Sequence, residues 1–194
     1  PIRNITIFDG LTRVGLDAEV AQPISGFVVP PSGSPEGKLL LLAYEGDAEK
    51  TGDSLLWNGT AISDDQNPAD NFFNSSRSKL GQAVSVAGDL PQLSGVANSM
   101  ASMDMDTVNV TPLLMPGATS ANVSIKVTSD VVYLGMMATS IRSKKPILET
   151  TLTYPPNAGT RQGDVIEFTS TTKNTGDDTA AGVDSGSVTV YSGR

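Results

Sequence analysis

The sequence predicts an all-β protein: an antiparallel β-sandwich, jelly-roll or immunoglobulin-like, followed by a short C-terminal β extension. Three observations favour this fold class. Short apolar segments alternate with turn residues along the 194-residue chain, no long stretch carries apolar residues at helical spacing, and 19 glycines interrupt the sequence. Aromatic residues make up only 5%, so we expect a core built mainly from Val, Leu, Ile and Met.

In the first part of the chain, the sequence predicts strand regions at residues 4–8, 24–29, 38–44 and 54–63. The third, KLLLLAY, is a continuous apolar run whose length and flanking glycines favour a strand buried on both faces over a buried helical turn. The fourth contains Asn58-Gly59 between two apolar segments, a strong signal for a β-hairpin. We expect Trp57, beside this turn, to lie in the core.

A long polar loop follows at residues 64–82, with Phe72 and Phe73 as its apolar anchor. Beyond it the sequence predicts strands at residues 83–88, 107–114, 120–129 and 131–143, with an irregular segment at 89–106. In ANVSIKVTS, the side chains of Val123, Ile125 and Val127 are expected to share one face.

A domain boundary is predicted near SKKPILE, residues 143–149. Residues 1–143 would form a complete sandwich of roughly eight to ten strands, judged from strand spacing. Residues 144–194 would form an abbreviated immunoglobulin-like extension with about three strands by the same criterion.

Charge and hydropathy exclude several classes of partner. The net charge of −8 argues against nucleic acid, because phosphate binding needs a basic face. The longest apolar run, KLLLLAY, is far shorter than the ~20 residues of a membrane-spanning helix, so we expect no membrane insertion.

The composition also argues against an enzyme. The chain has no cysteine and no histidine, which removes thiolate metal sites, the usual zinc sites and the Ser–His and Cys–His nucleophile pairs. Carboxylate pairs such as Glu45 and Asp47 have no aromatic sugar platform beside them, since Trp57 is the only tryptophan. We therefore expect a non-catalytic protein.

Several sequence motifs resemble known bacterial surface modules. The motifs GDS…NGT, NPADNFFNSSRS, AVSVAGDLP and MDMDTVNVTP resemble the amino-terminal module of large surface proteins from myxobacteria and related bacteria. Residues 138–178 are similar to the opening of an immunoglobulin-like "conserved repeat" domain, with its signature GDVIEFT…NTG. The resemblance covers residues 25–178 and implies an extracellular or cell-surface location, without known catalytic residues.

The chain departs from this repeat after NTG, where several more strands are normal but only one, at residues 187–193, is expected. A three-stranded sheet leaves an apolar face and two edges open. It could dock on the first domain, or a strand from another subunit could complete it, which repeated head to tail gives a filament. For each terminal strand, pairing within its own chain is the more frequent arrangement. The candidate assembly residues are Ile2, Ile5, Ile7, Phe8, Ile166, Phe168, Val188, Val190 and Tyr191.

These observations predict an extracellular structural protein: a self-assembling, pilus-like fibre subunit or an adhesin module joined by strand donation. Its partners would be copies of itself and the surface of a host or neighbouring cell. The alternative is a monomeric β-sandwich that binds carbohydrate or another surface ligand, with calcium as the one candidate cofactor.

Two constellations are weaker candidates. Calcium could be held by acidic residues in SDDQNPADN and MDMD, although neither segment matches an EF-hand and solvated acids are the favoured interpretation. These residues are Asp64, Asp65, Asp70, Asp104 and Asp106. A Lys–Asn isopeptide bond would need Lys145, Asn174 and Glu149 or Glu167 buried together, whereas a surface lysine and a turn-forming asparagine are the simpler expectation.

Overall fold

The computed structural model describes residues 3–31, 35–142, 146–154, 168–176 and 179–183. The chain divides into two compact units, residues 1–143 and 144–194. The prediction of an all-β sandwich is confirmed, since the described residues form twelve strands and a single short 3₁₀ helix, η1 (Thr111–Leu113). None of the helical residues described forms a segment long and apolar enough to cross a membrane.

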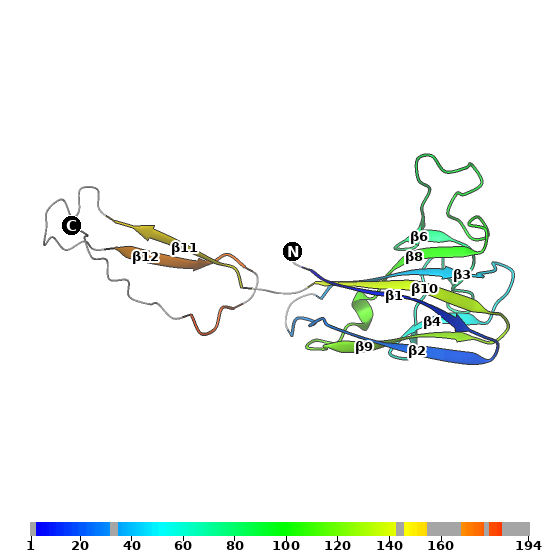
Figure 1. The fold of residues 1–194 in the computed structure, drawn as a ribbon, viewed down its shortest axis with the longest axis horizontal. Helices are drawn as coiled ribbons and strands as arrows, with labels where there is room; N and C mark the ends of the chain where they lie inside the picture. Colours follow the sequence, from blue (N-terminus) through cyan, green and yellow to red (C-terminus); the bar gives the residue numbers. More distant parts are fainter. Residues whose placement is uncertain (1–2, 32–34, 143–145, 155–167, 177–178, 184–194) are drawn as a thin grey trace, which may run out of the picture. The chain divides into compact units, whose positions relative to one another are not determined.

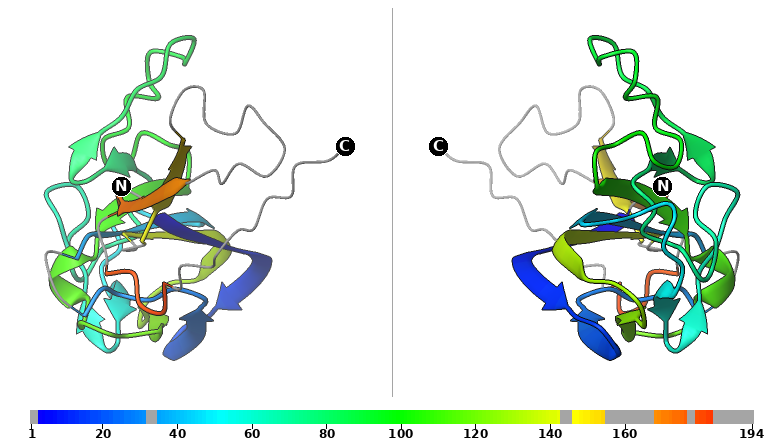
Figure 2. Two further views of the ribbon diagram at one scale, coloured as in Figure 1. Left: turned by 90° about the vertical axis from the view of Figure 1, so that its left-hand side faces the viewer. Right: turned by 90° about the vertical axis from the view of Figure 1, so that its right-hand side faces the viewer.

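Ten strands form the first unit. They are β1 (Arg3–Val14), β2 (Ala18–Ser25), β3 (Gly37–Tyr44), β4 (Asp53–Trp57), β5 (Thr60–Ala61), β6 (Arg77–Lys79), β7 (Gln82–Ala83), β8 (Met103–Asn109), β9 (Ser120–Val127) and β10 (Val132–Arg142). One sheet has the order β1-β10-β3-β8-β6-β7 and the other β2-β9-β4-β5 (Figure 1). All pairings between these strands are antiparallel except that of β6 with β8. The segment between β7 and β8 projects away from both sheets in two views (Figures 1 and 2).

The core lies between these sheets and follows the predicted alternation. Val123, Ile125 and Val127 of β9 are all buried, as expected for one face of a strand. Trp57 is buried at the end of β4, beside a turn in which Asn58 and Gly59 both have positive φ. This is the predicted hairpin, closed by the pairing of β4 with β5.

Strand β3 corrects one prediction. Leu39 and Leu41 are buried in the core, but Leu40 and Leu42 are only half-buried, on the outer face of the six-stranded sheet. The continuous apolar run therefore marks a strand with a covered inner face and a partly open outer face, not one buried on both sides.

Several predicted boundaries are also wrong. The first strand was expected to end at residue 8 but extends to Val14. The second strand was expected at residues 24–29, whereas β2 ends at Ser25. Pro23 is tolerated within β2 because β2 is an edge strand of its sheet. Of the strand expected at residues 83–88, only Ala83 lies in a strand, as the last residue of β7. Strand β8 begins within residues 89–106, which were expected to be irregular.

The second unit contains a β-hairpin within its described residues. Strand β11 (Leu148–Thr153) pairs with β12 (Thr169–Asn174) in an antiparallel register from Leu148 opposite Asn174 to Thr153 opposite Thr169. The third strand predicted here, at residues 187–193, lies outside the described residues.

Candidate assembly surfaces and a buried acidic cluster

The β11–β12 hairpin has two chemically different faces. Because side chains alternate along a strand, Leu148 and Leu152 project to one face and Thr151 to the other. Tyr154 and Phe168 continue the apolar face beyond the paired residues, with ring centroids 5.8 Å apart. The opposite face is polar; it carries Glu149, Thr151, Thr153, Thr169, Thr171 and Lys173. The face with Leu148 and Leu152 also carries Thr150, Ser170, Thr172 and Asn174, so its apolar character comes from the two leucines and the Tyr154–Phe168 pair.

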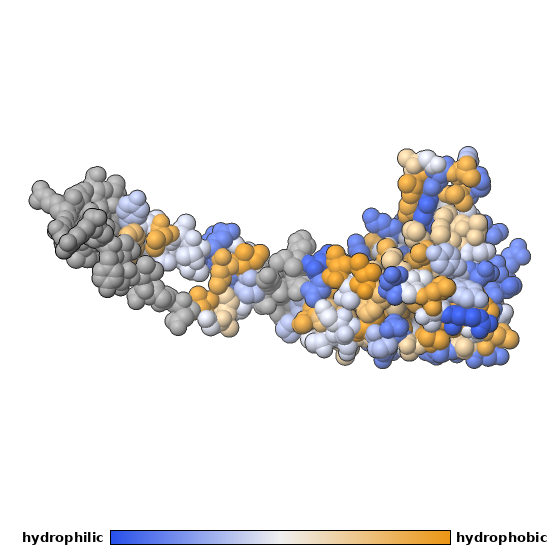
Figure 3. Space-filling model, in the orientation of Figure 1, coloured by the Kyte–Doolittle hydropathy of each residue, from blue (hydrophilic) through white to orange (hydrophobic). Residues whose placement is uncertain are grey.

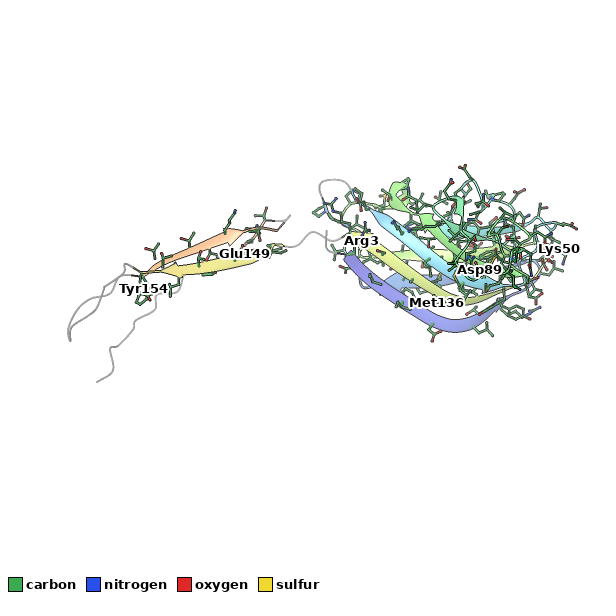
Figure 4. The ribbon with its side chains drawn as sticks, turned by 90° about the horizontal axis from the view of Figure 1, so that it is seen from above. Arg3, Lys50, Asp89, Met136, Glu149 and Tyr154 are labelled. Atoms are coloured by element: carbon green, nitrogen blue, oxygen red, sulfur yellow. The ribbon has the colours of Figure 1, made fainter. Side chains whose placement is uncertain are left out.

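The side chains on both faces of this hairpin are exposed in the described part of the chain. All residues of β11 and β12 are exposed, including Leu148 at 46% and Leu152 at 55%. Tyr154 is 63% exposed despite its contact with Phe168. Figure 4 shows Glu149 and Tyr154 on this two-stranded unit. Within the described residues no other strand pairs with β11 or β12, so each presents a free edge.

Strand β1 supplies a second open surface. Ile5 and Ile7 are 67% and 65% exposed on the outer side of β1, whereas Phe8 points inward and packs against the core. Figure 3 shows hydrophobic residues gathered along this part of the sandwich. β1 pairs with β10 of its own chain along its length. As a candidate donor strand it is therefore already paired internally.

The outer apolar surface continues across the sheet from β1. Cross-strand neighbours place Ile7 beside Ala138 and Leu40, and Met136 beside Leu42 and Met105 in the next row. Figure 4 shows this sheet from above, with Arg3 and Met136 labelled. Of the other candidate assembly residues, Phe168 is half-buried, and the rest lie outside the described residues: Ile2, Ile166, Val188, Val190 and Tyr191.

The acidic candidates separate into two groups. Asp65 and Asp70 are exposed on the loop between β5 and β6, and Asp64 is partly buried there. Asp104 and Asp106, in contrast, are fully buried on the inner side of β8, where Asp106 lies opposite Leu41 of β3. The expectation that they are solvated acids is wrong, because the strand face they occupy is the covered one.

The covering segment is the β5–β6 loop, which lies over the inner side of β8. Phe72 and Phe73 are fully buried and pack edge to face, with ring centroids 5.2 Å apart. The backbone N–H of Phe73 donates to Oδ1 of Asp53, at 2.7 Å, and the N–H of Ser76 donates to Oδ1 of Asp104, at 3.1 Å. Sequence reasoning found the aromatic anchor but missed Asp53, since its carboxyl holds loop backbone rather than matching any motif.

Burial changes the acidity of three carboxyls. Desolvation raises the pKa of Asp53 to about 6, although the N–H groups of Phe73 and Phe72 oppose the shift. Desolvation raises the pKa of Asp104 to about 8, and that of Asp106 to about 6. The neighbouring charge of Asp64 adds to the shift at Asp106. Within the described residues, none of the ion pairs involves any of these three carboxyls.

A hydrogen-bonded chain joins Asp64 to Asp106. Oδ1 of Asp64 accepts from the backbone and the side-chain amide of Asn67. The same amide donates to Oγ of Ser78, at 3.0 Å, and its Oδ1 accepts from Oγ of Ser76. Ser76 lies 3.4 Å from Oδ1 of Asp106, so loop and strand meet through neutral polar groups.

The cluster contains more acceptors than donors. In the described part of the chain, several buried oxygens have no hydrogen-bond partner: Oδ2 of Asp64, Asp104 and Asp106, and Oδ1 of Asn71 and Asn74. Leaving one such group unsatisfied costs about 1–3 kcal/mol. No group of three or more acidic side chains converges as a metal site within the described residues.

The isopeptide candidates are only partly within the described residues. Oδ1 of Asn174 accepts from the backbone N–H groups of Ile147 and Gly176, at 3.1 and 3.0 Å. This is a turn-forming role. Glu149 is exposed and lies near the hydroxyl of Thr175, whereas Lys145 and Glu167 lie outside the described residues.

Comparison of the chain with protein-family models, with curated proteins and with solved structures found no match. Its interpretation therefore depends on the geometry of the described residues.

Proposed function

We propose that the chain is a structural module of an extracellular, pilus-like or adhesive assembly, joined to neighbouring copies by β-strand addition at the β11–β12 hairpin. The observation that carries the proposal is the open apolar face of this hairpin. Leu148, Leu152 and Tyr154 project together and are each between 46% and 63% exposed. A two-stranded hairpin in water is marginally stable, and a third strand or a second layer is what stabilises such an element.

The partner's contribution would satisfy two separate needs. Strand addition pairs the free N–H and C=O groups of β11 or β12, which gives affinity without regard to sequence. Side chains from the added segment then cover Leu148 and Leu152, which gives register. If each copy both receives and supplies a segment, the contact is head to tail and generates a filament rather than a closed dimer. The motif resemblance to bacterial surface proteins supports the extracellular setting.

Self-association tests the proposal. We expect light scattering after size exclusion to show concentration-dependent oligomers, and negative-stain microscopy to show fibres. Leu152→Lys should abolish both, because it places a charge on the apolar face. Thr151→Lys is the matched control: it adds the same charge one residue away on the polar face and should leave assembly intact. A strict monomer at high concentration, or equal effects of the two variants, would reject the proposal.

A second candidate function has its own observation. The projecting segment between β7 and β8 exposes Val86, Leu90 and Val96, at 52%, 59% and 46%. Apolar side chains held away from the sandwich favour contact with a carbohydrate or another surface ligand by a monomeric module. Binding of the monomer to a glycan panel, lost on changing these three residues to serine, would support this function; unchanged binding would dismiss the segment's role.

A further inference from the structure

The acidic cluster beneath the β5–β6 loop has a defined composition. The side chain of Asp106 is fully buried; its carboxyl receives hydrogen bonds from Ser76 and Ser78, but its Oδ2 atom has no hydrogen-bond partner among the described residues. Oδ2 of Asp64 is likewise buried and unpartnered, and the charge of Asp64 acts directly on Asp106. The groups between them are the hydroxyls of Ser76 and Ser78 and the amide of Asn67. Asn67 and Ser76 thus link the two carboxyls, and none of the ion pairs among the described residues supplies either with a lysine or arginine.

From this arrangement we propose that Asp64 and Asp106 together bind a hard divalent cation, with Ca²⁺ as the best match. Every candidate ligand atom is an oxygen, and hard cations prefer carboxylate, amide and hydroxyl oxygens. Ca²⁺ accepts irregular sets of such ligands, whereas Mg²⁺ requires near-ideal octahedral geometry. The free Oδ2 atoms of Asp64 and Asp106 supply the charged ligands, and the surrounding serine and asparagine oxygens supply neutral ones.

Asp104 is excluded from this site by its surroundings. Its Oδ1 accepts from the N–H of Ser76. Its Oδ2 lies against Gly46, so closely that a Cβ atom added to that glycine would lie 1.9 Å from it. Backbone therefore occupies the approach to this oxygen. The approach of Gly81 to Asp64 is looser, since a Cβ atom added to that glycine would lie 3.6 Å from the carboxyl carbon.

The cation would connect the covering loop to the sheet. Asp64 lies at the start of the β5–β6 loop, just beyond the four-stranded sheet, whereas Asp106 lies in the middle of β8 in the six-stranded sheet. An ion shared by both residues replaces a repulsive contact with an attractive one. Loss of the ion should therefore loosen the loop, which carries Phe72 and Phe73, and lower the melting temperature of the first unit.

Calcium titration of the full chain at pH 7.5 tests this proposal. After treatment with EDTA, isothermal titration with CaCl₂ should give one site per chain. At a Ca²⁺ concentration about 100 times Kd, the melting temperature reported by Trp57 fluorescence should rise by about 5–10 °C, by ligand linkage. Mg²⁺ at the same concentration should produce a smaller rise.

Variants locate the site. Asp64→Asn and Asp106→Asn should each abolish the calcium response, and Asp64→Asn keeps the test decisive if the buried variant fails to fold. Asp70→Asn, an exposed change in the same loop, should retain it. An unchanged melting temperature in the wild-type chain with and without Ca²⁺ would overturn the proposal, as would equal loss of the response in Asp70→Asn and Asp64→Asn. The melting temperature does not report self-association, so absence of a calcium response would reject the cation site without testing the proposed function.

Discussion

Strands β9 and β11 both place apolar side chains on one face, but the two faces have different surroundings. In β9, Val123, Ile125 and Val127 are all at most 2% exposed, whereas in β11 Leu148 and Leu152 are 46% and 55% exposed. The side chains have similar apolar character and both strands pair with antiparallel neighbours. Alternation therefore determines which side chains share a face, but burial requires a second layer to cover that face.

This contrast has an energetic consequence. Burying a Val, Leu or Ile side chain contributes roughly 1.5–3 kcal/mol relative to leaving it exposed. The sandwich gains this stabilising free energy along both sheets, whereas the hairpin gains little of it in its described residues. The hairpin should therefore depend on additional contacts, and the sandwich should not.

The largest expected effect comes from truncating matched leucines in the two units. Leu41→Ala leaves a cavity in the fully packed core and should destabilise the sandwich by about 2–5 kcal/mol. Leu152→Ala removes an exposed side chain and should change the free energy of unfolding of the sandwich by less than about 0.5 kcal/mol. Urea unfolding followed by Trp57 fluorescence measures both, because the only tryptophan lies in the sandwich.

The outer face of β3 provides a control within one strand. Leu42 neighbours Leu41 but is only half-buried, so Leu42→Ala should cost clearly less than Leu41→Ala. Equal losses would mean that the outer face of the six-stranded sheet is as well covered as the core, contrary to the structure.

The next effect concerns pH. Asp53 has an ordinary pKa of 3.8 and a folded-state pKa of about 6, so the folded state binds the proton more tightly. Its protonated form stabilises the fold below pH 4, and this contribution is lost as the pH rises through 6. The shift corresponds to about 3 kcal/mol. The charge of Asp130 raises the pKa further, and the N–H groups of Phe72 and Phe73 lower it.

Asp53→Asn removes the titrating group and keeps an oxygen to accept from Phe73. In EDTA, we expect the decrease in unfolding free energy between pH 4 and 7 to be about 3 kcal/mol smaller in this variant than in the wild-type chain. Urea titrations at several pH values measure the difference. Parallel pH profiles for the two proteins would show that Asp53 ionises freely in the folded chain.

The extent to which the fold could be predicted from the sequence differs between regions of the chain. The fold class, the Asn58-Gly59 hairpin and the buried face of β9 follow from local patterns, since turn chemistry and alternation act over a few residues. The half-open outer face of β3 could not be read in this way. KLLLLAY is apolar on both sides, and only the absence of a covering layer in the described structure distinguishes them.

The acidic cluster was harder still to predict. Asp104 and Asp106 were expected to be solvated because MDMD lies in a segment predicted to be irregular and matches no calcium-binding motif. Their burial depends on a loop some thirty residues away in sequence, as the contact from Ser76 to Asp104 illustrates. Such long-range packing leaves no local trace. Asp53 illustrates the same point, since its partner is the backbone of Phe73 rather than another motif residue.

A smaller effect is expected at the hairpin turn of the sandwich. Gly59 has a φ of +78°, and an added Cβ would meet nothing within 4 Å. Gly59→Ala should therefore cost only the conformational preference, about 1 kcal/mol, and lower the melting temperature by about 2–4 °C. Gly59→Asn should cost less, because asparagine tolerates this conformation. An equal loss for both would point to packing rather than backbone conformation.

The smallest effect should be confined to the second unit. Asn174→Ala removes the oxygen that accepts from Ile147 and Gly176, so the end of the hairpin should open more readily. Loss of roughly 1 kcal/mol corresponds to about fivefold faster amide exchange in β11 and β12, which NMR-detected hydrogen exchange measures. Asn174→Asp keeps an acceptor oxygen and should largely preserve protection. The melting temperature reported by Trp57 should not change in either variant; a decrease would show that the hairpin contributes to the stability of the sandwich, contrary to the contrast between the two units.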